Sequence, residues 1–202
     1  MRFISTRGKS GKVSAAEAII KGLADDGGLF VPEYFPKVFQ KLKEKASISY
    51  EELSFEIIKE FFDDIPEEDL KEAIDEAYRG RFEILEKGAF LELYHGPTSA
   101  FKDVALLFLP QIMKKAKKVL AINDEITILT ATSGDTGKAA LEGFHDVEGF
   151  KCVVYYPKNG VSAIQERQMN TQVGNNVKVI AIEGNFDDAQ RCVKNIFADE
   201  EL

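Results

Sequence analysis

Hydrophobic residues in roughly the first eighty positions recur at helical spacing and follow serine-led segments. Residues 14–17 (SAAE) and 49–52 (SYEE) have the spacing of a capping box, in which a serine oxygen and a glutamate satisfy free amides of a first helical turn. The first box predicts a short helix that extends to Leu23, and the second predicts a helix over the apolar residues that follow it. A third helix is expected just after Pro66, because a proline costs little in a first helical turn.

The second half of the chain alternates between extended apolar runs and helical patterns. Strands are expected over 90–96, 125–132, 151–157 and 177–184, and helices over 100–122, 135–146, 162–173 and 187–200. Pro110 should bend or interrupt the longest of these helices, and Ser162 and Gln165 hold capping positions in a later one. Strands of nearly continuous hydrophobicity between helices predict a parallel sheet covered on both faces.

The expected fold class is therefore α/β, with a small, mostly helical unit over residues 1–82 and an open, mostly parallel sheet with helices on both faces over residues 83–202. The chain ends within or just after a helical pattern, and no closing element of the sheet follows it. We therefore expect this chain to be the N-terminal part of a longer protein.

Composition narrows the classes of function. The 202 residues carry a formal net charge of −8, which argues against nucleic acid or an anionic membrane as a partner, since both require a basic patch. No apolar run approaches the roughly 20 residues of a membrane span, and the first ten residues contain no apolar signal region, so the cytoplasm is the expected location. Cys152 and Cys192 lie in apolar segments and are expected to be reduced, and no cysteine–histidine cluster indicates a metal.

Lys102 lies in an unusual place for a lysine. It follows a turn-forming Gly-Pro pair and Phe101, and it directly precedes a long apolar run. One interpretation is a structural lysine whose stem covers apolar surface while its ammonium reaches water. The other is a functional amine, since partial burial favours the neutral, nucleophilic form.

A second informative stretch runs from a hydrophobic strand through a glycine-containing turn into a helix, over residues 128–141. The amides and positive dipole end of such a helix attract anions at the carboxyl edge of a parallel sheet, and the hydroxyls of Thr132, Ser133 and Thr136 add donors. A tight turn without a ligand remains an alternative. Asp135 would repel a phosphate there, so it favours a ligand that also offers a proton or a positive charge.

A nucleotide P-loop does not fit the same stretch. That motif requires four residues between its glycines and a serine or threonine after its lysine. Here two residues separate Gly134 from Gly137, and Ala139 follows Lys138. The hydroxyl that would bind magnesium is therefore missing.

Four segments together resemble the pyridoxal-phosphate enzymes of fold type II, and specifically the threonine synthase family. They are residues 95–103 (HGPTSAFKD), 132–137 (TSGDTG), 5–8 (STRG) and 22–33 (GLADDGGLFVPE). The last two separate this family from serine dehydratases, cysteine synthases and tryptophan synthase β chains. The resemblance covers essentially the whole chain and implies a tryptophan synthase β-like fold, of which the chain contains only a part.

The resemblance implies the cofactor and its contacts. Lys102 would hold pyridoxal 5'-phosphate as a Schiff base and would then move protons at the substrate carbons. Asp135 would lie beside the ring oxygen of the cofactor, and Phe101 would line the pocket. A later loop that cradles the cofactor phosphate in the family is absent from these residues, so it is open whether this chain alone binds the cofactor or is active.

The same resemblance implies a lyase that converts O-phospho-L-homoserine and water to L-threonine and phosphate in threonine biosynthesis. Ser133, Gly134 and Thr136 match the loop that holds the substrate α-carboxylate. Alternatives from other classes are a nucleotide- or phosphate-binding module and a non-catalytic protein that is similar to threonine synthase. The oligomeric state is open.

Further polar residues have two interpretations each. Thr6 and Arg7 could approach the substrate phosphate, because a guanidinium matches phosphate geometry, or could simply lie on the surface. His95 could contact the cofactor or the turn. The lysine-rich run over residues 114–118 is expected to be a solvated helix face.

Overall fold

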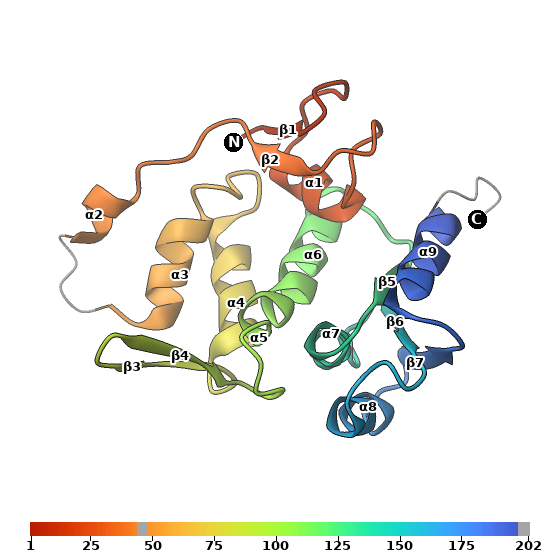
Figure 1. Cartoon of the computed structure of the whole chain (residues 1–202). Helices are drawn as coiled ribbons and strands as arrows, with labels where there is room; N and C mark the ends of the chain where they lie inside the picture. The colour runs from red at the N-terminus through yellow and green to blue at the C-terminus, as the bar shows by residue number, and fades with distance from the viewer. Residues whose placement is uncertain (44–47, 198–202) are drawn as a thin grey trace. The chain divides into compact units, whose positions relative to one another are not determined.

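A computed structural model describes residues 1–43 and 48–197 of the chain (Figure 1). The chain divides into two compact units. The first unit combines Met1–Gly80 with Gln111–Asn123, and the second combines Arg81–Pro110 with Asp124–Leu202.

The first unit is mostly helical, as expected. It contains α1 (Ala15–Lys21), α2 (Phe39–Lys43), α3 (Tyr50–Ile58) and α4 (Glu67–Tyr78), and strand β1 (Phe3–Ser5) pairs antiparallel with β2 (Phe30–Pro32). Both capping boxes are confirmed at the starts of α1 and α3. The prediction that α1 extends to Leu23 is wrong: the helix ends at Gly22, whose φ of 69° turns the chain, and Leu23 is 48% exposed beyond it.

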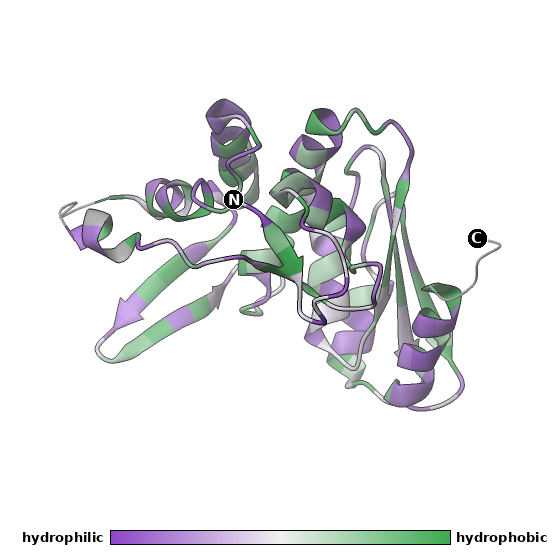
Figure 2. Cartoon of the chain, turned by 90° about the horizontal axis from the view of Figure 1, so that it is seen from above, coloured by the Kyte–Doolittle hydropathy of each residue, from purple (hydrophilic) through white to green (hydrophobic). Residues whose placement is uncertain are grey.

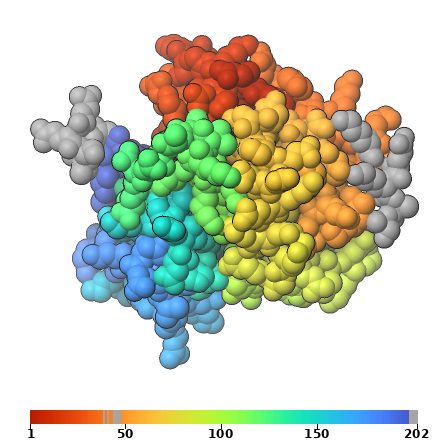
Figure 3. Space-filling model, turned by 180° about the vertical axis from the view of Figure 1, so that it is seen from behind, coloured from red at the N-terminus to blue at the C-terminus, as the bar shows by residue number. Residues whose placement is uncertain are grey.

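Paired charges connect α4 to α6 (Phe108–Val119) within the first unit. The ion pairs are Lys114–Glu76 (3.2 Å), Lys115–Glu72 (2.5 Å) and Lys118–Asp69 (2.9 Å). The prediction of a solvated lysine face is wrong for Lys115, which is 7% exposed, whereas the side chain of Lys118 is 69% exposed although it pairs with α4. Figure 3 shows the α4 and α6 surfaces in contact.

The second unit is built on a three-stranded parallel sheet in the order β5–β6–β7. Its elements are β5 (Ile126–Ala131), α7 (Asp135–Phe144), β6 (Phe150–Pro157), α8 (Ala163–Asn170), β7 (Val177–Ile182) and α9 (Phe186–Phe197). Figure 1 shows α7 on one side of the sheet and α9 on the other. The predicted parallel sheet with helices on both faces is confirmed, and its central strand buries Phe150, Cys152, Val154 and Tyr156.

The strand expected over 90–96 forms, but outside the parallel sheet. It is β4 (Phe90–His95), which pairs antiparallel with β3 (Glu83–Lys87) in a separate hairpin. Phe90, Leu91 and Tyr94 are exposed on it, so its apolar content does not reflect a buried strand. Figure 2 shows hydrophobic and hydrophilic segments along this hairpin.

The helix expected over 100–122 is divided into α5 (Asp103–Leu106) and α6, with the break at Leu107. The predicted interruption near Pro110 is confirmed, three positions before the proline. Pro110 is the third residue of α6, and an amide in a first helical turn has no intrahelical partner to lose. No helix in the described part of the chain is long and apolar enough to cross a membrane.

Candidate active site

The turn between β5 and α7 is organised by the hydroxyl of Thr132. Its Oγ1 accepts from the amides of Gly134 (3.1 Å) and Gly137 (3.0 Å) and donates to the carbonyl of Gly134 (3.0 Å). Thr132 is 2% exposed, so this hydroxyl is fully occupied inside the turn. Its expected role as an outward donor to an anion is not what the structure shows: Thr132 shapes the turn that carries the other donors.

The residues expected to hold a substrate carboxylate lie together at this turn. Ser133 is exposed, Gly134 is buried, and Thr136 is partly exposed in the first turn of α7. No described residue accepts a hydrogen bond from the backbone amides of Ser133, Asp135 or Thr136. These amides and the positive end of α7 can receive an anionic group.

Lys102 is held by a braced turn just before α5. Asp103 is 1% exposed, and its carboxylate accepts from the backbone amide of Thr98 at 2.9 Å and from the hydroxyl of the same residue. These bonds close the loop that precedes Lys102, which is the N-cap residue of α5. Asp103 was not identified from the sequence, although its place directly after Lys102 could have suggested a bracing role.

Lys102 and Asp135 meet across this site, although 33 positions of sequence separate them. The distance from Lys102 Nζ to Asp135 Oδ2 is 4.0 Å, and the side chains are 31% and 47% exposed. Lys102 Nζ also lies 4.8 Å from the ring centroid of Phe101, which is itself 57% exposed. The structure thus brings together the three residues that were expected to surround the cofactor, and leaves each of them accessible.

Helix α5 packs closely on α7, and this contact sets the distance between Lys102 and Asp135. A β-carbon added at Gly143 would lie 2.0 Å from the carbonyl oxygen of Leu106, the last residue of α5. Only glycine lets the two backbones approach this closely. The contact fixes α5, and with it the position of Lys102, relative to the helix that begins with Asp135.

Gln165 is a site residue that the sequence analysis assigned only to a helix cap. It caps α8 with Ser162, as predicted. Its Nε2 also donates to Asp135 Oδ1 at 2.8 Å. One feature of the sequence indicates this contact. The capping box of α8 has glutamine at the position where the boxes of α1 and α3 have glutamate.

Other polar residues singled out in the sequence have partners of their own. The side chain of Lys138 contacts Gln172 and lies 3.5 Å from Glu142, along the body of α7. His95 pairs with Glu92 at 2.8 Å on β4, and this hydrogen bond lowers the pKa of the Glu92 carboxyl. Arg7, in the first unit, donates to the carbonyl of Asp26 at 3.0 Å.

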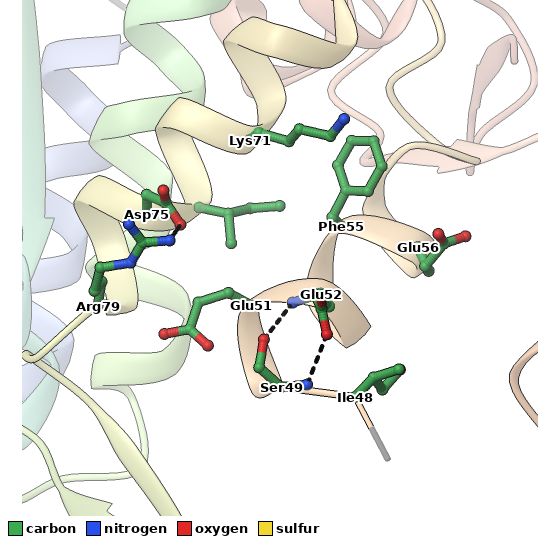
Figure 4. A pocket seen from close by; sticks show the side chains of 10 residues that line it. Ile48, Ser49, Glu51, Glu52, Phe55, Glu56, Lys71, Asp75 and Arg79 are labelled. Carbon is green, nitrogen blue, oxygen red and sulfur yellow. Dashed lines mark hydrogen bonds and ion pairs between the residues drawn. The ribbon is translucent and has the colours of Figure 1, made fainter. Parts of the chain in front are cut away.

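A separate groove of about 710 Å³ lies between α3 and α4 in the first unit (Figure 4). Several of its charged side chains already have partners. Glu52 caps α3 through Ser49, and Asp75 pairs with Arg79 at 2.8 Å. Two pairs of its polar residues are therefore bonded to each other.

Comparison with known proteins identifies relatives along the whole chain. The family model "Threonine synthase N terminus" matches residues 2–78. Threonine synthase of Pseudomonas aeruginosa is 41% identical over 99% of this chain and 44% of its own length. That of Saccharomyces cerevisiae is 38% identical over 99% of this chain and 43% of its own length.

Solved structures agree with these matches. PLP-bound threonine synthase from Brucella melitensis is 37% identical with a TM-score of 0.88, over 100% of this chain and 45% of that one. Threonine synthase from Escherichia coli is 35% identical with a TM-score of 0.84, over 100% of this chain and 47% of that one. This chain spans less than half the length of these relatives, and its sequence and fold are similar to the N-terminal portion of threonine synthases.

Proposed function

We propose that this chain is part of an enzyme that uses pyridoxal 5'-phosphate to convert O-phospho-L-homoserine and water to L-threonine and phosphate. The observation that carries the proposal is the meeting of the Lys102 amine with the Asp135 carboxylate beside a helix N-terminus with open amides. The PLP-bound relative from Brucella melitensis supports the choice of cofactor.

The residues present fit that cofactor. Lys102 has an amine at the end of a partly exposed side chain, so a carbonyl compound can reach it. Phe101 beside it offers an aromatic wall, and Asp135 offers an acceptor for a proton-bearing group of the ring. The cofactor would supply an electron sink for the substrate carbons, a chemistry that no side chain provides.

The turn fits the substrate's carboxylate. Ser133 and Thr136 have amides with no acceptor among the described residues at the positive end of α7, and Gly134, whose amide donates to Thr132, shapes the turn between them. Lys102, once released, is then the base and acid placed to move protons at the substrate carbons.

The proposal is tested by reduction with borohydride in the presence of pyridoxal phosphate, using the protein expressed from its complete gene. Peptide mass mapping then locates the pyridoxyl group. We expect one adduct on Lys102 and none on Lys138, the control lysine in α7. Labelling scattered over surface lysines, with Lys102 unmodified, would contradict the assignment.

A second candidate is a protein with the same cofactor and no threonine synthase activity. It is favoured by the relatives named "Threonine synthase-like 2" from rat and mouse, each 38% identical over 98% of this chain. Phosphate release from O-phosphohomoserine distinguishes the two. An adduct on Lys102 without phosphate release would support the second candidate.

The proposal includes the organisation of the chain. Residues 1–82 would form the N-terminal unit of the family, and residues 83–202 would form the first part of the cofactor-binding region. Cys152 and Cys192 are both free thiols, which suits the cytoplasm as the proposed location.

A further inference from the structure

Gln165 donates a hydrogen bond to the carboxylate of Asp135, which also approaches Lys102. The two oxygens of Asp135 are divided between two partners: Oδ1 accepts from Gln165 Nε2 at 2.8 Å, and Oδ2 lies 4.0 Å from Lys102 Nζ. A carboxylate bound at one oxygen by a fixed donor cannot rotate freely about its last bond. The direction of Oδ2 therefore depends on Gln165.

The capping box fixes the orientation of the glutamine amide. Gln165 Oε1 accepts from the backbone amide of Ser162 at 3.2 Å and from its hydroxyl at 3.0 Å. Since these partners are donors, the oxygen must face Ser162 and the NH₂ group must face Asp135. The same NH₂ lies over the turn, because a β-carbon at Gly134 would be 2.7 Å from Nε2.

The residue type at position 165 carries additional information. A capping box can use glutamate or glutamine, and the boxes of α1 and α3 use Glu17 and Glu52. Only the box of α8 uses glutamine, and only there does the distal group contact a carboxylate. Helix capping alone therefore does not account for Gln165, whereas the contact with Asp135 does.

We propose that Gln165 is a positioning residue, which aims the Asp135 carboxylate at the group bound beside Lys102. This inference rests on the proposed function for the identity of that group. Its chemistry is a proton-bearing or cationic one, because it would face a carboxylate that is held in one direction. Gln165 acts through Asp135 and makes no contact with Lys102 in its own right.

The variant Gln165→Glu separates this role from capping. Glutamate keeps the capping box of α8 but places a carboxylate oxygen against Asp135 Oδ1, and like charges in contact repel. Asp135 should then turn away from its present direction. The matched control is Glu17→Gln, the reverse exchange in the box of α1, where no carboxylate is in contact.

The first measurement uses the complete protein with pyridoxal phosphate. We expect Gln165→Glu to lower the yield of the borohydride adduct on Lys102 by at least about tenfold, since a small misplacement of a binding group has effects of this order. The visible circular dichroism of the bound cofactor should change as well. Glu17→Gln should match the wild type in both, and equal behaviour of both variants would overturn the proposal.

The second measurement uses the protein without cofactor, so it does not depend on the proposed function. In urea unfolding, Gln165→Glu should lower the midpoint in the wild-type background and should not lower it in an Asp135→Asn background, where repulsion is removed. An equal loss in both backgrounds would show that position 165 does not act through Asp135. Absence of any Lys102 adduct in the wild type would refute the proposed function. The positioning role of Gln165 would still be decided by comparing the effect of Gln165→Glu in the wild-type and Asp135→Asn backgrounds.

Discussion

Replacing Gly143 by alanine tests whether the approach of α5 to α7 holds the site together. Gly143 lies in α7, one residue before its end, and the added methyl group would lie 2.0 Å from the carbonyl oxygen of Leu106. Ordinary contact begins near 3.4 Å, so one of the two backbones must move by about 1.4 Å. The obstacle is main chain, which a side-chain rotation cannot relieve.

Two effects of opposite sign compete in this variant. Helix propensity alone favours alanine over glycine by about 1 kcal/mol in a helix interior. Overpacking a close contact costs about 1–3 kcal/mol, and the upper part of that range applies because the displaced group is backbone. We therefore expect a net destabilisation of about 1–2 kcal/mol, opposite in sign to the effect of propensity.

Urea unfolding measures this change in the free energy of unfolding directly. A loss of this size corresponds to a midpoint lower by about 0.5–1 M for an ordinary denaturant dependence. Gly11→Ala is the control, because no atom lies within 4 Å of an added β-carbon there, and it should stay within about 0.5 kcal/mol of the wild type. If Gly143→Ala were more stable than the wild type, helix propensity would outweigh the contact and the account of how α5 is placed would be refuted.

Three further outcomes are expected. Thr132→Val should destabilise by about 2–3 kcal/mol because two amides inside the turn lose their acceptor, whereas Thr132→Ser should retain most of the stability; equal losses in urea unfolding would contradict this. Hydrogen bonds to the Asp26 carboxylate, above all from Ser5, lower the pKa of Asp26 from 3.8 to about 2. The stabilisation that these bonds give is therefore present above pH 3.8 and is lost as the pH falls toward 2. Asp26→Asn should remove this part of the acid dependence of unfolding. Burial raises the pKa of the Cys152 thiol to about 12, so iodoacetamide should label Cys192 in the folded protein and Cys152 only after unfolding, as mass spectrometry would show.

The elements with local causes were predictable from the sequence. All three capping boxes begin helices where their spacing indicates, because the serine and its partner lie within one turn of each other. The three parallel strands were also predictable, since their apolar runs are bounded by turns. Each of these signals is complete within about ten residues of sequence.

Elements that depend on distant partners were not predictable in this way. The pairing of β4 with β3 could not be derived from its apolar residues, because they lie on an exposed hairpin and have the same pattern as a buried strand. The lysines of α6 gave no sign of their partners on α4, some forty positions earlier. The 4.0 Å approach of Lys102 to Asp135 depends on helix packing, and only the family resemblance anticipated it.

Two aspartates beside Lys102 show why the site residues can be distinguished from structural ones. Asp103 is 1% exposed, and both of its oxygens are bound by Thr98, so its contribution is to the fold. Asp135 has a half-exposed side chain, and an ion pair at that exposure contributes only about 0–1 kcal/mol to stability. A residue that stabilises so little would not require a dedicated donor from a neighbouring helix, yet Gln165 provides one. The arrangement is therefore better explained by a ligand that Asp135 must face than by the stability of the folded chain.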